Sequence, residues 1–327
     1  MVSVQPITVA QYGIGPIGAE IVKLLMTKSW IRIIAAVDVD PQKIGRDLGE
    51  VIGIDQRLGV KVTADLREKP AVVCHSTGSR LRQVEPQLRA LLEHGSHVVS
   101  TCEELAFPLD KEVRENLQKV ARANNVTLLG TGVNPGFVMD KLPLTLSAVC
   151  QQVRSIEIIR VVDASLRREP LQRKVGAGMT REQFKQAVKD GKIKHMGLKE
   201  SLMLVANGLN IDLDQVSEEK IEPVMAEGPI KTQYLSVDPG FVAGVHQTIQ
   251  GSKRGTIDLS LDIKMFLGAK DPRDEVRIKG VPDVNMRIDG GVHGDRATAA
   301  MVVNCIPRVF AARPGVLTMD DIPVSFR

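Results

Sequence analysis

The sequence predicts an α/β protein, with an N-terminal doubly wound parallel sheet of the Rossmann type and a C-terminal α+β domain. Over about the first 130 residues, short apolar runs alternate with longer amphipathic segments, the pattern of repeated βα units. After Gly130 the alternation stops, and several strand-like runs follow one another between residues 230 and 288. We therefore expect one domain over residues 1–135 and a second over residues 136–327.

The first domain is expected to contain strands at residues 7–12, 33–37, 71–75, 98–101 and 126–129. Helices fall between them, among them residues 81–93 and 110–124. Right-handed crossovers between such strands make the sheet parallel, and ligands of parallel sheets bind at the carboxyl ends of the strands. The turns after His75, Thr101 and Leu129 are therefore where functional residues are expected.

The second domain is expected to begin with a helix from about residue 135 to 149 and a long strand over residues 155–163. Residues 256–266 alternate apolar and polar side chains, as a strand with one buried face does. A last helix, over about residues 296–306 and ending before Pro307, is expected to pack back on the first domain.

Residues 13–18 form the pattern GxGxxG between an apolar run and a helix-like segment. In a dinucleotide site, Gly13 allows the tight turn, Gly15 lets the backbone approach a pyrophosphate, and Gly18 permits close packing of helix on strand. Asp38 ends the next apolar run, where a carboxylate accepts hydrogen bonds from the ribose hydroxyls. NAD or NADP is thus the expected cofactor, and its expected contacts are Gly13, Ile14, Gly15, Pro16, Ile17, Gly18 and Asp38.

Composition and charge exclude several other classes of protein. The apolar fraction of 43% and charged fraction of 25% are ordinary for a soluble protein. A net charge of +4 is too small to indicate binding to nucleic acid or to an anionic membrane. We find no signal-peptide pattern and no apolar run long enough to span a bilayer. Four widely spaced cysteines argue against a metal site and favour a cytoplasmic location.

Three stretches carry a resemblance to a known family: residues 11–18 (QYGIGPIG), 99–105 (VSTCEEL) and 130–140 (GTGVNPGFVMD). Together they resemble the native amine dehydrogenases and 2,4-diaminopentanoate dehydrogenases, a branch related in fold to dihydrodipicolinate reductase. The resemblance implies NAD(P)-dependent oxidative deamination of a primary amine or diamine to a ketone or aldehyde and ammonia, reversible as reductive amination. It also implies a second domain that binds substrate and forms a homodimer.

In that family a glutamate in the segment after the fifth strand is the acid/base residue, and this chain offers Glu103 and Glu104 there. Successive side chains of an extended segment point to opposite faces, so one of the two is expected in the cleft. We expect Glu104 by its match to the family position, with Glu103 as the alternative. A purely structural reading has both as favourable charges opening a surface helix.

Further site residues follow from the turns at the same edge. His75, Ser76, Thr77 and Thr101 are expected to contact the cofactor. Asn134 is expected at the nicotinamide carboxamide, although it would also serve as the N-cap of an ordinary helix. A roomy aliphatic substrate pocket is expected from Phe137, Met139 and Leu142, with Thr298 as a further candidate.

Several alternatives stay open at this stage. Asp38 repels a 2′-phosphate and favours NAD, whereas the nearby Lys43 and Arg46 are able to accept NADP. A dihydrodipicolinate reductase is disfavoured because residues 159–165 (IRVVDAS) lack that family's lysine and Ser-Gly-Thr turn. An amino acid dehydrogenase would need a basic clamp, for which Arg160, Arg167 and Arg168 are the candidates; a sensor would bind NAD without turnover. The physiological amine is not specified by the sequence.

Overall fold

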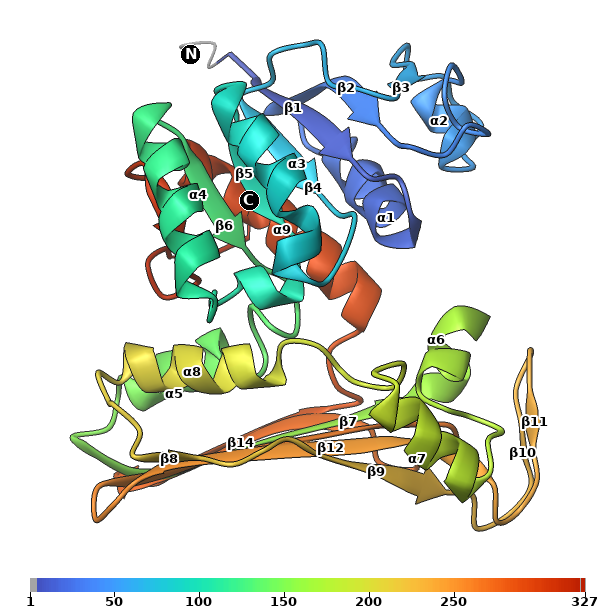
Figure 1. Cartoon of the computed structure of the whole chain (residues 1–327), viewed down its shortest axis with the longest axis vertical. Coiled ribbons are helices and arrows are strands. Elements are labelled where there is room, and N and C mark those ends of the chain that lie inside the picture. Colours follow the sequence, from blue (N-terminus) through green and yellow to red (C-terminus); the bar gives the residue numbers. More distant parts are fainter. Residues whose placement is uncertain (1–4, 324, 327) are drawn as a thin grey trace. The chain divides into compact units, whose positions relative to one another are not determined.

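The computed structural model describes residues 5–323, 325 and 326, and the chain divides into two units (Figure 1). Unit 1 comprises the chain up to Phe137 together with the segment from His293 onward, and unit 2 is Val138–Val292. The boundary expected at residue 135 lies close to this division, and the last helix belongs to unit 1.

Unit 1 contains a seven-stranded sheet in the order β16-β6-β5-β4-β1-β2-β3, in which every neighbouring pair is parallel. This confirms the predicted Rossmann-type sheet. The chain adds β2 and β3 on one side of β1 and then β4 on the other, so the order reverses between β1 and β4. Ligands of open α/β sheets bind at such a reversal. The strands are β1 (Ile7–Tyr12), β2 (Ile31–Val37), β3 (Val62–Thr63), β4 (Val72–His75), β5 (His97–Ser100), β6 (Thr127–Gly130) and β16 (Gly315–Leu317).

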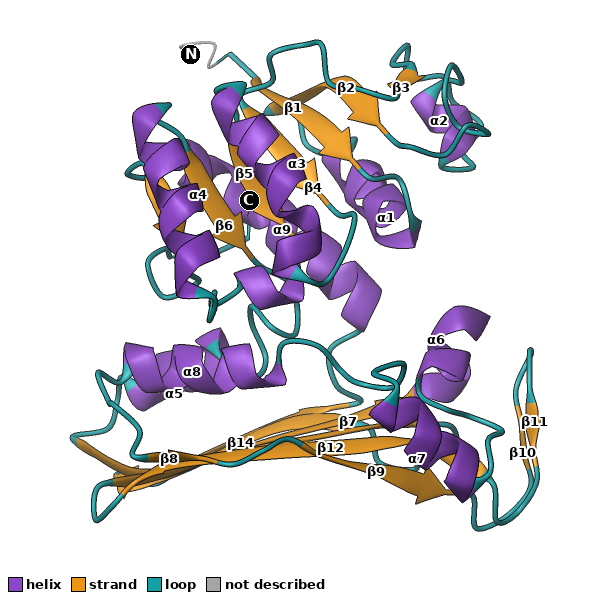
Figure 2. Cartoon of the chain, in the orientation of Figure 1, coloured by secondary structure: helices purple, strands orange, loops and turns teal. Residues whose placement is uncertain are grey.

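Helices cover both faces of this sheet (Figure 2). Side chains of adjacent strand residues point to opposite faces: Ala35 packs into the core with Leu88 and Leu117, while Ala36 packs with Val22. Leu88 and Leu117 lie on neighbouring helices on one face of the sheet. Val22 lies on the first helix, which covers the opposite face. The helices of unit 1 are α1 (Pro16–Leu25), α2 (Leu48–Val51), α3 (Leu81–Glu93), α4 (Lys111–Ala123), α9 (Gly294–Phe310) and the 3-10 helix η1 (Glu103–Leu105).

Unit 2 is built on a mixed sheet in the order β15-β14-β7-β13-β12-β8, with β9 also paired to β12. Only β7 and β13 run parallel among its described strand pairs. The predicted α+β domain is therefore confirmed. Its strands are β7 (Gln152–Asp163), β8 (Gln215–Val216), β9 (Lys220–Met225), β12 (Val242–Lys253), β13 (Ile257–Phe266), β14 (Arg273–Val281) and β15 (Val284–Asp289), while β10 (Ile230–Lys231) and β11 (Ser236–Val237) pair separately.

The helices of unit 2 lie along one face of this sheet (Figure 2). The alternation predicted for β13 is observed, since Ile257, Leu259, Leu261 and Ile263 are all buried. The opposite face carries charged pairs between strands, including Arg277 with Glu157 at 3.0 Å. The helical segments are α5 (Lys141–Ser147), α6 (Glu169–Lys174), α7 (Arg181–Lys189), α8 (Leu198–Gly208) and the 3-10 helix η2 (Ala164–Leu166).

Two predicted helix boundaries are wrong. The helix expected from residue 135 begins only at Lys141, whose N–H donates to Asp140 as the N-cap, because Gly136 has a φ of +123° that a right-handed helix does not allow. The last helix continues past Pro307 to Phe310. Proline removes only one backbone N–H donor from the helix. The packing of the buried residues along α9 stabilises the helix by more than this lost hydrogen bond.

Candidate active site

The carboxyl ends of four neighbouring strands lie in register and bring the predicted residues of unit 1 to one edge. Tyr12 pairs with His75, His75 with Ser100, and Ser100 with Gly130. The glycine loop, the turn after β4, the turn containing η1 and the Asn134 segment therefore begin side by side. The sequence predicts these segments after separate strands, and the parallel register of the strands brings the segments together at one edge of the sheet.

The glycine loop has the geometry that a pyrophosphate requires. A Cβ on Gly18 would lie 2.1 Å from the Gly13 carbonyl oxygen, so only glycine allows α1 to pack this closely on the loop. A Cβ on Gly15, in contrast, would meet nothing within 4 Å. Gly15 is also the N-cap of α1, with no side-chain cap and no acidic residue in the first turn. The first N–H groups of α1 thus fit the phosphates of a dinucleotide.

Asp38 is fixed at the end of β2 next to this loop. Its Oδ2 accepts hydrogen bonds from the Ile14 N–H at 2.7 Å and Lys43 Nζ at 3.0 Å, and its Oδ1 accepts from the Asp40 N–H at 2.9 Å. Partial burial raises the pKa of this carboxyl, but these donors and the Lys43 charge outweigh it, so the pKa is lowered overall. Asp38 is therefore a charged, preorganised acceptor, and Lys43 sits beside it.

A buried glutamine that the sequence reasoning missed ties the glycine loop to the turn after β4. Gln11 is fully buried, and its Nε2 donates to the Gly13 carbonyl oxygen and to Ser76 Oγ, both at 2.9 Å. Ser76 Oγ in turn donates to the Gly13 carbonyl oxygen at 2.9 Å. The only signal in the sequence was a polar residue inside an apolar run. Ser76, expected to contact cofactor, thus holds the loop through its hydroxyl.

His75 lies inside a polar network beneath the edge. Its Nδ1 is 2.9 Å from Ser100 Oγ, and its Nε2 is 2.9 Å from Thr77 Oγ1 and 3.0 Å from Gln87 Oε1. The ring is fully buried and stacks on Tyr12 with centroids 5.7 Å apart. Burial lowers the pKa of His75 to about 4, against a smaller opposing effect of the Gln87 hydrogen bond. The imidazole is therefore neutral at pH 7 and orients Thr77.

This buried histidine predicts a pH-dependent stability. Below a pKa of about 6.5 the unfolded chain binds a proton at His75 that the folded chain does not bind until about pH 4, so stability falls as the pH falls through this window. Between pH 7 and pH 5 the loss from this residue is about 2 kcal/mol. Urea titrations at both pH values should show a smaller loss for His75→Asn than for the wild type. An equal loss would contradict the assignment.

The turn after β5 carries the two candidate acids on η1. The Thr101 N–H donates to the His75 carbonyl oxygen at 2.9 Å, which anchors the start of the turn. Glu104 Oε2 accepts a hydrogen bond from the Leu81 N–H at 2.7 Å. Glu103 and Glu104 are both half-buried. The Glu104 carboxylate is therefore joined to the first residue of α3.

The segment after β6 is a series of turns in which Asn134 is half-buried. The Thr131 N–H donates to the Ser100 carbonyl oxygen at 2.9 Å, and the Val133 N–H donates to Thr298 Oγ1 at 3.2 Å. Thr298, expected in the pocket, thus supports the turn that carries Asn134. Phe137 is half-buried and ends unit 1; in unit 2, Met139 is fully buried and Leu142 is half-buried.

Arg160, one candidate for a carboxylate clamp, is committed to structure within unit 2. It is buried, its Nη1 donates to Asp274 Oδ1 at 2.6 Å, and its Nη2 donates to the Val292 carbonyl oxygen at 2.8 Å. The pKa of His195 is lowered to about 3. Burial is the largest cause, followed by the positive charges of Lys174 and Arg160. The guanidinium of Arg160 therefore holds the end of unit 2 together.

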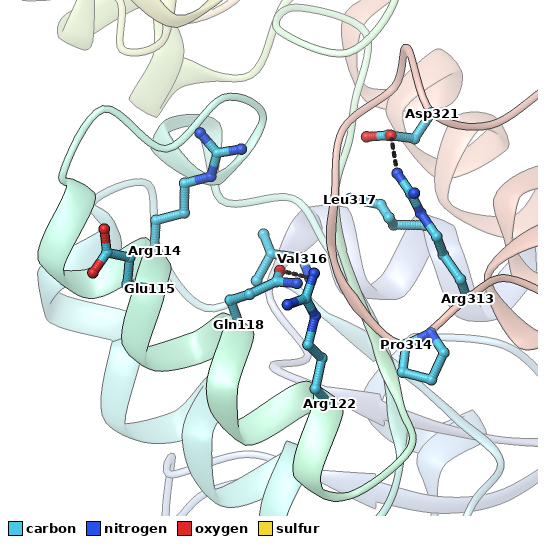
Figure 3. Close-up of a pocket in the computed structure, with 9 residues that line it drawn as sticks. All are labelled: Arg114, Glu115, Gln118, Arg122, Arg313, Pro314, Val316, Leu317 and Asp321. Atoms are coloured by element: carbon cyan, nitrogen blue, oxygen red, sulfur yellow. Dashed lines mark hydrogen bonds and ion pairs between the residues drawn. The ribbon is translucent and has the colours of Figure 1, made fainter.

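A cavity of about 330 Å³ in unit 1 lies between α4 and the segment containing β16 (Figure 3). Arg313 pairs with Asp321 at 3.0 Å, and Gln118 Oε1 accepts from the Val316 N–H at 2.6 Å. The predicted site residues are not among those that line it. We therefore treat this cavity as separate from the candidate site. Its lining residues are Arg114, Glu115, Gln118, Arg122, Arg313, Pro314, Val316, Leu317 and Asp321.

Two features are absent from the described residues. No group of three or more His, Cys, Asp or Glu side chains among them is placed to hold a metal ion. In the same part of the chain, no helix has both the length and the apolar character needed to cross a membrane.

Comparison with known proteins confirms the resemblance read from the sequence motifs. Residues 137–326 match the family described as the 2,4-diaminopentanoate dehydrogenase C-terminal domain. The chain is 30% identical over 325 residues to the 2,4-diaminopentanoate dehydrogenase of Acetoanaerobium sticklandii, covering 95% of this chain and 92% of that protein.

Two solved structures share the fold. The amine dehydrogenase of Mycobacterium smegmatis superposes with a TM-score of 0.87 at 22% identity, covering 98% of this chain and 97% of that one. GenD2 of gentamicin A biosynthesis, solved in complex with NAD, has a TM-score of 0.57 at 16% identity, covering 98% and 91%. The family match over residues 137–326 and the 30% sequence identity over 95% of the chain show that this protein belongs to the 2,4-diaminopentanoate dehydrogenase family of oxidoreductases.

Proposed function

We propose that this protein catalyses the NAD(P)-dependent oxidative deamination of a primary amine or diamine to a ketone or aldehyde and ammonia, and the reverse reductive amination. The observation that carries the proposal is a pair of glutamates at the carboxyl edge of the parallel sheet. Glu103 and Glu104 lie on the turn after β5, in the same unit as a glycine loop that fits a dinucleotide. Family membership supports the same reaction.

The chemistry explains why an acid is needed there. An amine carbon gives up a hydride only when its nitrogen can donate a lone pair, so an ammonium must first lose a proton. A carboxylate on η1 takes that proton and releases it to solvent. As a carboxylate again, it stabilises the positive iminium and accepts a proton from the water that hydrolyses it. The nicotinamide, when bound, accepts the hydride. The loop, Asp38 and the Asn134 segment hold the cofactor, and the glutamate manages protons on the substrate.

Asp38 makes NAD the favoured cofactor in this proposal, with NADP as a usable second one because Lys43 already sits against the carboxylate. Asp38→Ser is expected to raise the ratio of kcat/KM for NADP to that for NAD by about tenfold or more, since a repulsive charge is removed. Initial rates with both cofactors measure this ratio. Asp55→Ser is the matched control, because Asp55 is exposed in the loop after α2 and should leave the ratio unchanged. Equal ratios in the Asp38 variant and the wild type would remove the assigned ribose contact.

Within unit 1, Phe137 and Thr298 are the proposed substrate contacts. Aromatic residues make up only 3% of the chain, so an aromatic cage around a small substrate is disfavoured. We also propose a homodimer formed through the helix-free face of the unit 2 sheet, where Arg277 and Glu157 lie on neighbouring strands. The four free cysteines fit a reducing cytoplasm.

The test of the proposed function is NADH formation from NAD with 2,4-diaminopentanoate and a panel of simple amines and diamines. One ammonia should be released for each NADH formed. Binding of NADH without turnover across the panel would contradict the proposal and favour a sensor. Reduction of dihydrodipicolinate in place of amine oxidation would identify the related reductase activity instead.

A further inference from the structure

The cavity between α4 and the segment containing β16 carries more positive than negative charge (Figure 3). Its volume of about 330 Å³ is enough for a small molecule. All of its lining residues belong to unit 1. The charged side chains among them are three arginines and two acids: Arg114, Arg122, Arg313, Glu115 and Asp321.

Two of the arginines lie on one face of α4. Arg114, Gln118 and Arg122 follow one another at intervals of four residues, so their side chains share that face. The two arginines are about 12 Å apart along the helix axis. Gln118 Oε1 accepts the Val316 N–H at 2.6 Å, so the face that carries both arginines is turned toward β16.

Among the residues that the structure describes, neither arginine of this face forms an ion pair. Asp110 is four residues before Arg114 but pairs with Arg82 at 2.6 Å. Asp110 also accepts the Val113 N–H as the N-cap of α4. Arg114 lies over the ring of Phe107, 6.0 Å from its centroid, and this contact leaves the charge of the guanidinium unneutralised.

Elsewhere in the chain, arginines pair with acids four residues away. Such pairs are Arg46 with Glu50, Arg89 with Glu85, and Arg173 with Glu169. On α4 the position four residues from both arginines is Gln118, and an uncharged amide neutralises neither of them. The sequence of α4 therefore places two uncompensated guanidinium groups at the cavity.

The two acids of the lining do not cancel this positive charge. Asp321 pairs with Arg313 at 3.0 Å, and its other carboxylate oxygen accepts the Thr318 N–H at 2.8 Å. Glu115 is exposed and points away from Arg122 and Arg313 (Figure 3). Arg122 also complements the dipole of α4, because it lies in the last turn. That role accounts for one cation, whereas arginines from two segments line this cavity.

We propose that this cavity is a binding site for a small anion that carries two or more carboxylate or phosphate groups. Guanidinium groups bind both kinds of group through paired N–H donors. Since Arg313 comes from the segment opposite α4, a ligand with several charged groups reaches more than one arginine (Figure 3). The Gln118 oxygen is held by Val316, so its amide nitrogen adds a donor between the arginines of α4. The site shares no residue with the candidate active site and does not depend on the proposed function.

The test is isothermal titration calorimetry of the NADH-saturated protein, with citrate and inorganic pyrophosphate as separate probes. Saturation with NADH keeps pyrophosphate from binding at the glycine loop. Arg122→Gln should weaken binding about tenfold, because one charged donor is lost, and added salt should weaken it further. Lys119→Gln is the matched control. It removes the same charge from an exposed position on the same helix, but Lys119 does not line the cavity, so binding should equal that of the wild type.

Gln118→Glu separates binding from folding. Glutamate keeps an oxygen for the Val316 N–H and places a carboxylate four residues from both arginines. This variant should unfold at or above the wild-type midpoint, yet bind both probes about tenfold or more weakly, because the new charge pairs with the arginines and repels an anion.

Binding of either probe that Arg122→Gln and Gln118→Glu weaken, and Lys119→Gln does not, would support the site. The probe that binds more tightly would show whether carboxylate or phosphate is preferred. No binding of either probe to the wild type would overturn the proposal. Equal affinities in the wild type and all three variants, or equal weakening in all three, would also overturn it, because the anion would then be bound elsewhere or by overall charge alone.

Discussion

Gly18→Ala is expected to lose both stability and cofactor binding. The new Cβ would lie 2.1 Å from the Gly13 carbonyl oxygen, and 3.0 Å from both Gln11 Nε2 and Ser76 Oγ. The nearest atom belongs to the backbone of a tight turn and cannot rotate away. Overpacking of this kind costs about 3 kcal/mol. Because α1 must move away from the loop, its first N–H groups also leave the position that fits a pyrophosphate.

Gly15→Ala is the matched control for this prediction. A Cβ there meets nothing within 4 Å, and the residue has an ordinary φ of −76°. Its unfolding midpoint should therefore equal that of the wild type, whereas NADH affinity should fall about tenfold or more because the methyl group lies where the pyrophosphate approaches. Thermal unfolding and NADH fluorescence titration measure the two effects. A stable Gly18→Ala variant, or a Gly15→Ala variant that binds NADH normally, would show that the glycines do not divide these roles.

Gly130→Ala is expected to damage catalysis through the neighbouring turn. A Cβ on Gly130, at the end of β6, would lie 2.4 Å from the Leu105 carbonyl carbon and 2.6 Å from the Ala106 backbone nitrogen. The backbone of η1 must shift to make room, and the candidate acids move with it. A displacement of about 1 Å in an active site costs about 100-fold in rate.

The measurement for Gly130→Ala is kcat for amine oxidation, with NADH affinity determined separately. Gly228→Ala serves as the comparator, because a Cβ there meets nothing within 4 Å and Gly228 lies in unit 2. We expect a large fall in kcat, with NADH binding largely retained because the glycine loop is on β1. A normal kcat in a folded Gly130→Ala variant would mean that the η1 turn does not carry the reacting group.

The fold could be predicted because its determinants are local. Alternating apolar and amphipathic segments specify βα units, and the spacing of Gly13, Gly15 and Gly18 specifies how the first strand meets the first helix. The parallel register then follows from the topology, so placing Thr101 and Asn134 on turns after two different strands was enough to place them at one edge.

Contacts between segments that are far apart in the chain could not be predicted from the sequence. The hydrogen bond from the Leu81 N–H to Glu104 joins residues 23 positions apart, and no sequence pattern indicates it. The roles of Gln11 and Thr298 likewise depend on partners brought together only by folding. The delayed start of α5 reflects the backbone of Gly136, a conformational choice that helix periodicity does not encode.

The most direct test of the central claim, that a nicotinamide held at this edge takes a hydride from an amine-bearing carbon, is a deuterium-transfer measurement. The protein is incubated with NAD and a primary amine or diamine, oxidised by the wild type, that carries deuterium at that carbon, and the NADH formed is analysed by mass spectrometry. We predict one deuterium in each NADH and one ammonia released with it. NADH without deuterium, or no NADH from any amine despite bound cofactor, would contradict the account.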